Sequence, residues 1–127
     1  IIAGHTYDVI SCADLALVAS GTATLETGLL GVPMVIIYKV SFLSYVLGKL
    51  FVQVKNIGLV NIVAGKTVVP ELIQGDASGK RIAEEALAIL NSKEKKQKII
   101  KELEALRDKL GEPGAAGRAA QIACDMI

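Results

Sequence analysis

Two uninterrupted apolar runs of strand length, separated by a short helical pattern, constrain this chain more than any other feature. The runs are DLALVAS at residues 14–20 and VPMVIIY at residues 32–38. Because neither run alternates apolar with polar residues, both are typical of strands buried on two faces of a parallel sheet. Residues 23–30 between them have a helical pattern that ends at Gly31, with Pro33 just beyond. The sequence therefore predicts a β-α-β unit and an α/β fold.

The residues after this unit predict a mixture of helix and loop. Residues 41–55 have the pattern of an amphipathic helix capped by Ser41, and the core explains their apolar face more simply than a membrane anchor does. Residues 57–66 are punctuated by glycine, which predicts a loop. Residues 69–74 predict a short helical turn that begins at Pro70.

The second half of the chain predicts a helical tail. Ser78 is placed to cap a helix over residues 80–90, a second helix covers 93–110 and stops at Gly111, and a third covers 115–126. The apolar stripes expected to pack inward are, in chain order, Ile82, Ala83, Ala86, Leu87 and Leu90; Ile99, Leu103, Leu106 and Leu110; and Ala119, Ile122, Ala123 and Met126.

The composition excludes several classes of function. A net charge of +1 and an aromatic content of 4% give no reason to expect nucleic-acid binding. No apolar run reaches the roughly 20 residues of a transmembrane helix, and the first residues do not resemble a signal peptide. Cys12 and Cys124 have neither disulfide nor zinc spacing, so we expect small buried hydrophobes in a reducing cytoplasm. The chain begins at Ile1 without an initiator methionine, which indicates a piece of a larger protein.

The first strand enters the following helix through Ser20, Gly21 and Thr22. A strand that turns through small residues into a helix leaves backbone N–H groups exposed at its carboxyl end. Together with the helix dipole, these groups favour an anion, most often phosphate. The simpler alternative is that Ser20 or Thr22 only caps the helix.

Glu26 favours the interpretation as a ligand site. A capping box places its glutamate three residues after the cap, whereas Glu26 lies four residues after Thr22 and six after Ser20. A spacing of four stacks Glu26 above Thr22 on one helix face. Because a carboxylate can accept hydrogen bonds from a diol, the pattern predicts a nucleotide with its phosphates at the turn and its ribose on Glu26.

Two stretches of the chain resemble the lipid-A-disaccharide synthase family. They are SGTATLETGLLGVPMVIIYK and LVNIVAGKTVVPELIQ, and the similarity extends from DVISCADLALVASGTATLE to AAGRAAQIA. The resemblance depends on the order of three motifs: SGTATLE, the Asn-x-x-Ala-Gly loop and the Pro-Glu-Leu-x-Gln turn. One departure is Val60, at a position where the family commonly has proline before the asparagine.

The resemblance implies a GT-B glycosyltransferase built from two Rossmann-like halves, of which this chain would be part of one. Residues 1–76 would then belong to the UDP-sugar-binding domain, with residues 77–127 forming C-terminal helices that pack on it. The implied reaction is the inverting transfer of 2,3-diacylglucosamine from UDP to 2,3-diacylglucosamine 1-phosphate. It forms the β-1,6 disaccharide of lipid A and releases UDP.

The resemblance also implies roles for individual residues and partners. Carried over by position, the UDP-binding residues are Ser20, Gly21 and Thr22 at the diphosphate, Glu26 at the ribose, and Asn61 and Gln74 at further polar positions. The general base is expected in an N-terminal half outside this chain, and no metal or other cofactor is expected. The family acts at the cytoplasmic face of the inner membrane. The expected partners are therefore the two lipid substrates, the membrane surface and a second copy bound through the C-terminal helices.

Four other polar features have a functional and a structural interpretation. His5 is the only histidine and a candidate base, but it lies at the start of the chain. Lys39 could meet the phosphates or simply be solvated. Glu71 lies in the first turn of its expected helix, where the dipole alone favours a carboxylate. The lysines from 93 to 101 form either the solvated face of a helix or a membrane-surface patch.

Two alternative functions stay open at this stage. Another UDP-sugar transferase of GT-B fold would share the strand, turn, helix and glutamate. A helical interaction module with a vestigial nucleotide site, dimeric through its helices, would share the tail. This segment alone is expected to lack transferase activity, because a GT-B site needs both halves.

Overall fold

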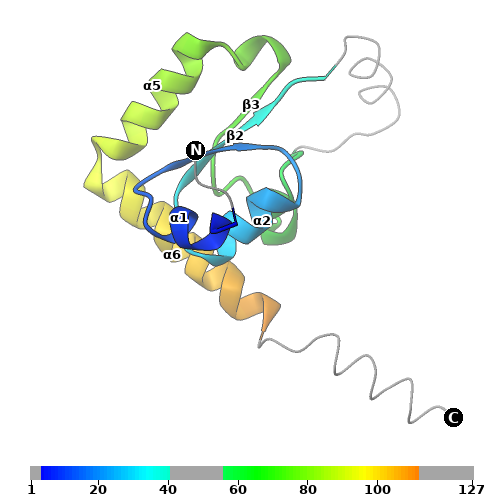
Figure 1. The fold of residues 1–127 in the computed structure, drawn as a ribbon, viewed down its shortest axis with the longest axis vertical. Helices are drawn as coiled ribbons and strands as arrows, with labels where there is room; N and C mark the ends of the chain where they lie inside the picture. Colours follow the sequence, from blue (N-terminus) through cyan, green and yellow to red (C-terminus); the bar gives the residue numbers. More distant parts are fainter. Residues whose placement is uncertain (1–3, 41–55, 112–127) are drawn as a thin grey trace, which may run out of the picture.

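A computed structural model of the protein describes residues 4–40 and 56–111. At its centre lies a parallel three-stranded sheet with helices packed around it (Figure 1). Ala16 is in register with Met34, and Ile36 is in register with Glu71. The predicted α/β class is therefore confirmed. The strands, in their order across the sheet, are β1 (Ala16–Ala19), β2 (Met34–Tyr38) and β3 (Glu71–Ile73).

The helices largely follow the sequence pattern. The predicted helices at 23–30, 80–90 and 93–110 are confirmed to within one residue at each end, and a first helix at the start of the chain was not predicted. The expected helices at 41–55 and 115–126 lie outside the described residues. The helical elements are α1 (Thr6–Ser11), α2 (Thr22–Leu29), α4 (Leu59–Ala64), the 3-10 helix η1 (Gln74–Asp76), α5 (Gly79–Leu90) and α6 (Lys93–Leu110).

The central strand β2 is covered on both faces. Met34 and Ile36 point to one face and Val35 to the other, and none of the three is exposed. This is the reason that the strand reads as a continuous apolar run rather than an alternating one. The buried core that surrounds β2 draws on every layer of the fold: Val18, Met34, Val35, Ile36, Val60, Val69, Leu72, Ile89, Ile99, Leu103 and Leu106.

A glycine lets three helices meet beneath the sheet. A Cβ on Gly28 of α2 would lie 2.8 Å from a side-chain carbon of Val60 in α4 and 3.4 Å from one of Leu103 in α6. Real Cβ atoms essentially never come as close as 2.8 Å to another carbon, so a larger residue at Gly28 would force Val60 or its helix to shift. The predicted inward face of α6 is confirmed at Ile99, Leu103 and Leu106. Leu110, also predicted to pack inward, is 43% exposed.

The inward face of α5 differs from the prediction. Ile89 is fully buried, whereas Leu87 is 53% exposed and Leu90 is 44% exposed. The helix therefore packs through Ile82 and Ile89, a face rotated away from the predicted stripe. Since α5 contacts only β2 and α6 closely, one narrow side of it is enough to complete the core.

Two local predictions in the middle of the chain are wrong. The segment predicted as a loop is helix α4, with Gly58 before it and Gly65 in the left-handed conformation (φ 74°) after it. The predicted helical turn at Pro70 is strand β3 instead, which pairs with β2. Pro70 is tolerated because it precedes the strand, and its carbonyl accepts a hydrogen bond from Ile36 N at 2.9 Å.

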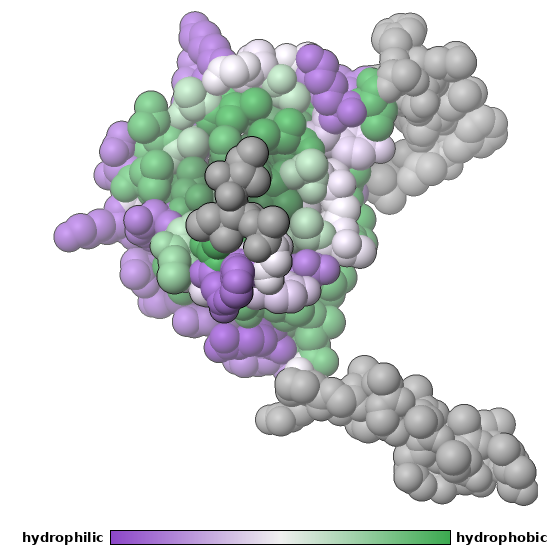
Figure 2. Space-filling model, viewed as in Figure 1, coloured by the Kyte–Doolittle hydropathy of each residue, from purple (hydrophilic) through white to green (hydrophobic). Residues whose placement is uncertain are grey.

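A broad apolar area remains on the outside of the described fold (Figure 2). Large apolar side chains that stay exposed include Leu17 on the edge strand β1, and Leu87 and Leu90 on α5. Single apolar residues scattered over a surface need no explanation, whereas a contiguous apolar area often marks a contact surface. Within the described residues, no helix combines the length and the apolarity needed to cross a membrane.

Candidate nucleotide site

The carboxyl ends of the three strands bring several predicted site residues to one edge of the sheet. Because all three strands are parallel, the residues that follow them lie along the same edge. Ser20 follows β1, Lys39 follows β2 and Gln74 follows β3. Ligands of open α/β sheets bind outside this edge, so the candidate site is built here.

The turn between β1 and α2 depends on Gly21. This residue has φ 153° and ψ −166°, a backbone conformation that is essentially restricted to glycine. Gly21 itself is the N-cap of α2, and no side chain caps the helix. The alternative in which Ser20 or Thr22 only caps the helix is therefore wrong. The amides of Thr22 and Ala23 therefore have no side-chain cap, which leaves them available to an anion.

The inner side of the same turn is fixed by Thr24. Its hydroxyl donates to Gly21 O at 2.8 Å and its amide donates to the same oxygen at 3.1 Å. Ser20 N donates to Ile37 O at 3.0 Å, which attaches the start of the turn to β2. The turn is thus held from behind, while Gly21 and Thr22 are exposed in front.

Glu26 lies one turn along α2 and is half-buried. Among the described residues, no hydrogen bond or ion pair to its carboxylate is found, so the group is available to a ligand. The buried polar side of α2 is formed instead by Thr24 and Thr27, which are 0% and 1% exposed. The helix therefore presents Thr22 and Glu26 away from the core, as their spacing predicts.

Gln74 contributes to the edge through hydrogen bonds from its side chain to the backbone of Val40. Its side-chain Nε2 donates to Val40 O at 3.0 Å, and its Oε1 accepts from Val40 N at 2.9 Å. Both ends of the amide are therefore occupied by the backbone just beyond β2. These two bonds hold the ends of β2 and β3 together, and the predicted contact of Gln74 with UDP stays a prediction.

Asn61 does not lie at the carboxyl edge, contrary to the prediction. It is fully buried, and its Oδ1 accepts from Val68 N at 2.8 Å and from Val69 N at 3.1 Å. Its Nδ2 donates to Val69 O at 2.9 Å and to Glu71 Oε1 at 2.7 Å. These partners stand at the amino end of β3, and they use every polar position of the amide. These bonds give Asn61 a structural role, and its predicted contact with UDP stays a prediction.

Glu71 completes the same buried network. Its Oε2 accepts from Ile57 N at 2.8 Å and its Oε1 from Gly58 N at 3.1 Å, in addition to the bond from Asn61. A Cβ on Gly58 would lie 2.3 Å from Ile36 Cδ1, so a larger residue here would force the Ile36 side chain to move. Glu71 therefore fixes the entry to α4 from a strand, and its predicted place in the first turn of a helix is wrong.

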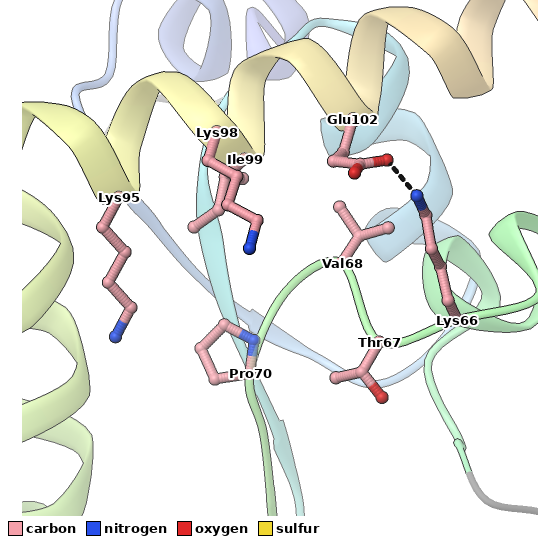
Figure 3. Close-up of a pocket in the computed structure, with 8 residues that line it drawn as sticks. All are labelled: Lys66, Thr67, Val68, Pro70, Lys95, Lys98, Ile99 and Glu102. Atoms are coloured by element: carbon pink, nitrogen blue, oxygen red, sulfur yellow. Dashed lines mark ion pairs between the residues drawn. The ribbon is translucent and has the colours of Figure 1, made fainter.

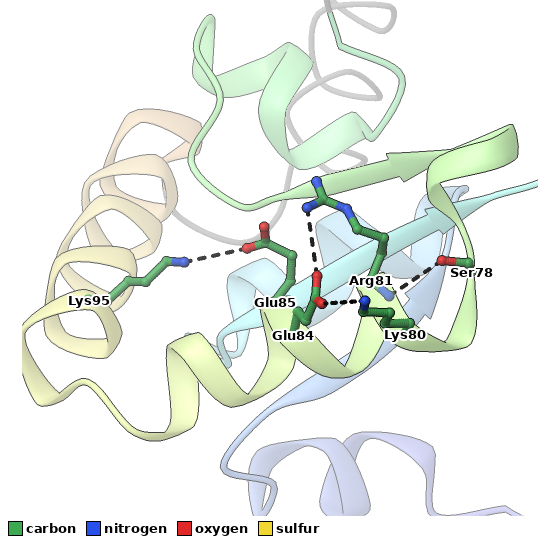
Figure 4. Close-up of polar contacts among 6 residues, drawn as sticks. All are labelled: Ser78, Lys80, Arg81, Glu84, Glu85 and Lys95. Carbon is green, nitrogen blue, oxygen red and sulfur yellow. Dashed lines mark hydrogen bonds and ion pairs between the residues drawn. The ribbon is translucent and has the colours of Figure 1, made fainter.

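The lysine-rich helix α6 is held by ion pairs. Lys96 Nζ lies 2.7 Å from Asp14 Oδ1, which joins α6 to the segment before β1. Lys95 Nζ lies 3.4 Å from Glu85 Oε2 on α5 (Figure 4). The Lys96 ammonium, first by hydrogen bonding and then by its charge, lowers the pKa of the Asp14 carboxyl below its usual value. Part of the predicted solvated face thus joins α6 to its neighbours.

The start of α5 is capped by a side chain. Ser78 Oγ accepts from Arg81 N at 3.4 Å, which confirms the predicted cap (Figure 4). Glu84 then faces Lys80 at 4.0 Å and Arg81 at 3.8 Å. These pairs are exposed, so each contributes less than about 1 kcal/mol to stability.

A separate cavity of about 310 Å³ opens between α6 and the chain that leads into β3 (Figure 3). Since that chain precedes β3, the cavity lies at the amino end of the strand, away from the nucleotide edge. Lys66 of its wall is paired with Glu102, and Lys95 is paired with Glu85. Its lining residues are Lys66, Thr67, Val68, Pro70, Lys95, Lys98, Ile99 and Glu102.

The remaining candidates from the sequence have simple surroundings. His5 is exposed, with Nδ1 3.3 Å from Asp8 Oδ2. Lys39 is exposed, and Cys12 is exposed rather than buried as predicted; Cys124 lies outside the described residues. Within residues 4–40 and 56–111, no three His, Cys, Asp or Glu side chains gather in a way that could hold a metal ion.

Comparison with known proteins decides the family. A family model described as lipid-A-disaccharide synthetase matches residues 1–126. The chain belongs to this family. The resemblance noted from the motifs is therefore confirmed, and the two alternatives from other families are set aside.

Relatives in this family match the chain from end to end. It is 60% identical over 127 residues to the lipid-A-disaccharide synthase of Syntrophus aciditrophicus (strain SB). The matched region covers 100% of this chain and 33% of that protein. It is 49% identical over 123 residues to that of Geobacter sulfurreducens, covering 97% and 32%. It is 46% identical over 127 residues to that of Nitrosococcus oceani, covering 100% and 33%. The chain thus spans about a third of the length of these curated relatives.

Proposed function

We propose that the intact protein is a lipid-A-disaccharide synthase of GT-B fold and that this chain supplies the part that grips UDP. The observation that carries the proposal is the glycine turn at the carboxyl edge of the sheet. Its helix start has no side-chain cap, and it stands in a chain that is 60% identical to a relative with that name. A turn of this kind suits a diphosphate, because its amides and the helix dipole both favour negative charge.

The proposal assigns a role to each exposed group of the turn. The diphosphate of the donor faces Ser20, Gly21 and Thr22, and the two ribose hydroxyls donate to the Glu26 carboxylate. Since negative charge grows on the diphosphate as it leaves, amides already aimed at it stabilise the transition state more than the ground state. This arrangement supports departure of UDP without any movement of the turn.

The reaction in the proposal is an inverting substitution at the anomeric carbon of the donor. The bond from this carbon to the UDP oxygen breaks, and a bond to the 6-hydroxyl oxygen of the acceptor forms on the opposite face. The hydroxyl proton passes to a general base outside this chain. The donor is UDP-2,3-diacylglucosamine and the acceptor is 2,3-diacylglucosamine 1-phosphate, which places the enzyme at the cytoplasmic face of the inner membrane.

The test of the nucleotide orientation is a titration of UDP and of 2′-deoxy-UDP into the intact protein. Glu26→Gln should weaken UDP binding by about 1–3 kcal/mol, the range for hydrogen bonds to a charged group. The Glu26→Gln variant should bind 2′-deoxy-UDP almost as tightly as UDP. The 2′-hydroxyl that distinguishes the two ligands no longer has a carboxylate to bond in the variant. Unchanged UDP affinity in a folded Glu26→Gln protein would refute the ribose assignment.

A further inference from the structure

Gln74 has a backbone conformation that side-chain-bearing residues rarely adopt. Among the described residues, Gln74 is the one residue other than glycine that has a positive φ, at 52°. Such a residue is uncommon and is kept where the surrounding structure requires it. Gln74 directly follows β3, at the edge where the nucleotide site is built. Its conformation therefore calls for a reason at that edge.

The reason lies in the reciprocal pair of hydrogen bonds that Gln74 makes. Its amide bonds both Val40 N, at 2.9 Å, and Val40 O, at 3.0 Å. The last regular pair between β2 and β3 joins Tyr38 and Ile73. The side chain thus continues the pairing of the two strands past the point where their backbones separate.

These bonds belong to a series that crosses the whole edge. Ser20 N donates to Ile37 O at 3.0 Å, so the start of the nucleotide turn is attached to the end of β2. Two residues further, Lys39 leaves the strand as an exposed cation, and Val40 is fixed by Gln74. Among the described residues, no ion pair of Lys39 is found. A fixed backbone at Val40 therefore fixes the start of the Lys39 side chain, which leaves the same edge of the sheet as the turn.

We propose that Gln74 is a positioning residue of the donor site. It does not touch UDP; it holds the backbone at Val40 so that the ammonium group of Lys39 reaches the diphosphate at the turn. This inference rests on the proposed function, since it needs a diphosphate at Gly21. It assigns the phosphate contact to Lys39 and explains why Gln74 keeps its uncommon backbone conformation.

The experiment is a double-mutant cycle on the intact protein, with UDP and uridine as the two probes. Gln74→Leu removes both hydrogen bonds at similar side-chain volume, and Lys39→Gln removes the cation. Each single change should raise the Kd for UDP by on the order of tenfold, the size of one hydrogen bond to a charged group. The Kd for uridine should stay unchanged. The double variant should bind UDP no more weakly than Lys39→Gln alone, because the two residues act through one contact.

A matched control separates positioning from general loosening. Thr67→Val removes the 2.9 Å bond from Thr67 Oγ1 to Asn56 Oδ1, at the opposite end of β3. It should change neither Kd. If Gln74→Leu does not fold, Gln74→Glu replaces it in the cycle. In that variant a carboxylate oxygen takes the place of Nε2, so the hydrogen bond to Val40 O is lost and the two oxygens repel each other.

The outcomes distinguish this inference from the function on which it rests. Normal UDP binding by Gln74→Leu, additive losses in the double variant, or an equal loss of uridine and UDP would each overturn the positioning role while leaving the proposed function intact. A wild-type protein that does not bind UDP would overturn the proposed function and this inference with it.

Discussion

Removing the Asn61 side chain should destabilise the chain around β3 rather than act on a ligand directly. Asn61→Ala deletes all four hydrogen bonds of a fully buried amide. Glu71 keeps two backbone partners, at Ile57 and Gly58, so its carboxylate is not left bare. The main loss falls on the amides of Val68 and Val69, whose acceptor disappears.

The magnitude follows from those two amides. A buried donor left without an acceptor costs about 1–3 kcal/mol, so two of them give about 2–6 kcal/mol. Water that enters the space of the lost amide recovers part of this, and we expect a net loss of about 3 kcal/mol. For a domain with a total stability of about 5–15 kcal/mol, this is a large fraction.

Hydrogen exchange in the intact protein measures this loss where it occurs. In Asn61→Ala, the amides of Val68 and Val69 should exchange roughly a hundredfold faster, as a loss of about 3 kcal/mol implies. Thr67→Val is the control, since it removes a single exposed bond in the same segment and should cost less than about 1 kcal/mol. Asn61→Asp keeps the acceptor but sets a carboxylate against Glu71, so its destabilisation should ease as the pH falls.

The opposite pattern would refute this reasoning. Unchanged exchange at Val68 and Val69 together with a strong loss of UDP affinity would return Asn61 to the ligand contact that the sequence motif predicts. It would also mean that the buried network forms differently in the intact protein.

Two smaller predictions follow from other polar groups. Within the described residues, Thr27 Oγ1 is buried without a hydrogen-bond partner, so Thr27→Val should be neutral or slightly stabilising in thermal unfolding; a marked fall in melting temperature would reveal a missing partner. The pKa of the Asp14 carboxyl is lowered in the folded state by Lys96, so the pair contributes stability above the unfolded pKa of about 3.9 and loses it as the pH falls through the lower folded value. The difference in melting temperature between wild type and Asp14→Asn should therefore shrink from pH 7 to pH 3, and a difference that does not vary with pH would contradict the pairing.

The parts of the fold that local patterns determine could be predicted from the sequence. The apolar runs of β1 and β2, the stop at Gly31 and the stripe of α6 each follow from period and punctuation. The turn through Gly21 could also be placed, because small residues between a strand pattern and a helical pattern mark a turn.

The parts that depend on distant contacts could not. Strand β3 is only three residues long and follows a proline, so its identity comes from pairing with β2 rather than from propensity. The roles predicted for Asn61 and Glu71 come from the family resemblance and from an expected helix, respectively. Their partners, the backbone of Ile57 to Val69, become visible only in three dimensions. The bonds of Gln74 to Val40 likewise join residues far apart in the sequence.

The exposed face of α5 has a similar origin. Its amphipathic pattern predicts a wide apolar stripe, but only the side that meets β2 and α6 is used, and Leu87 stays 53% exposed. A helical pattern shows which residues are suited to burial, and the number of neighbouring elements decides how many are buried.

The central claim is that the turn at Gly21 receives the diphosphate of UDP, and one comparison tests it most directly. UDP and uridine are titrated into the intact protein and into Gly21→Ala, which places a Cβ on a backbone at φ 153°. We predict that the variant loses the extra affinity of UDP over uridine, while uridine binds as before, because only the diphosphate meets the turn. A folded Gly21→Ala protein that still prefers UDP to uridine by the wild-type factor would contradict the account.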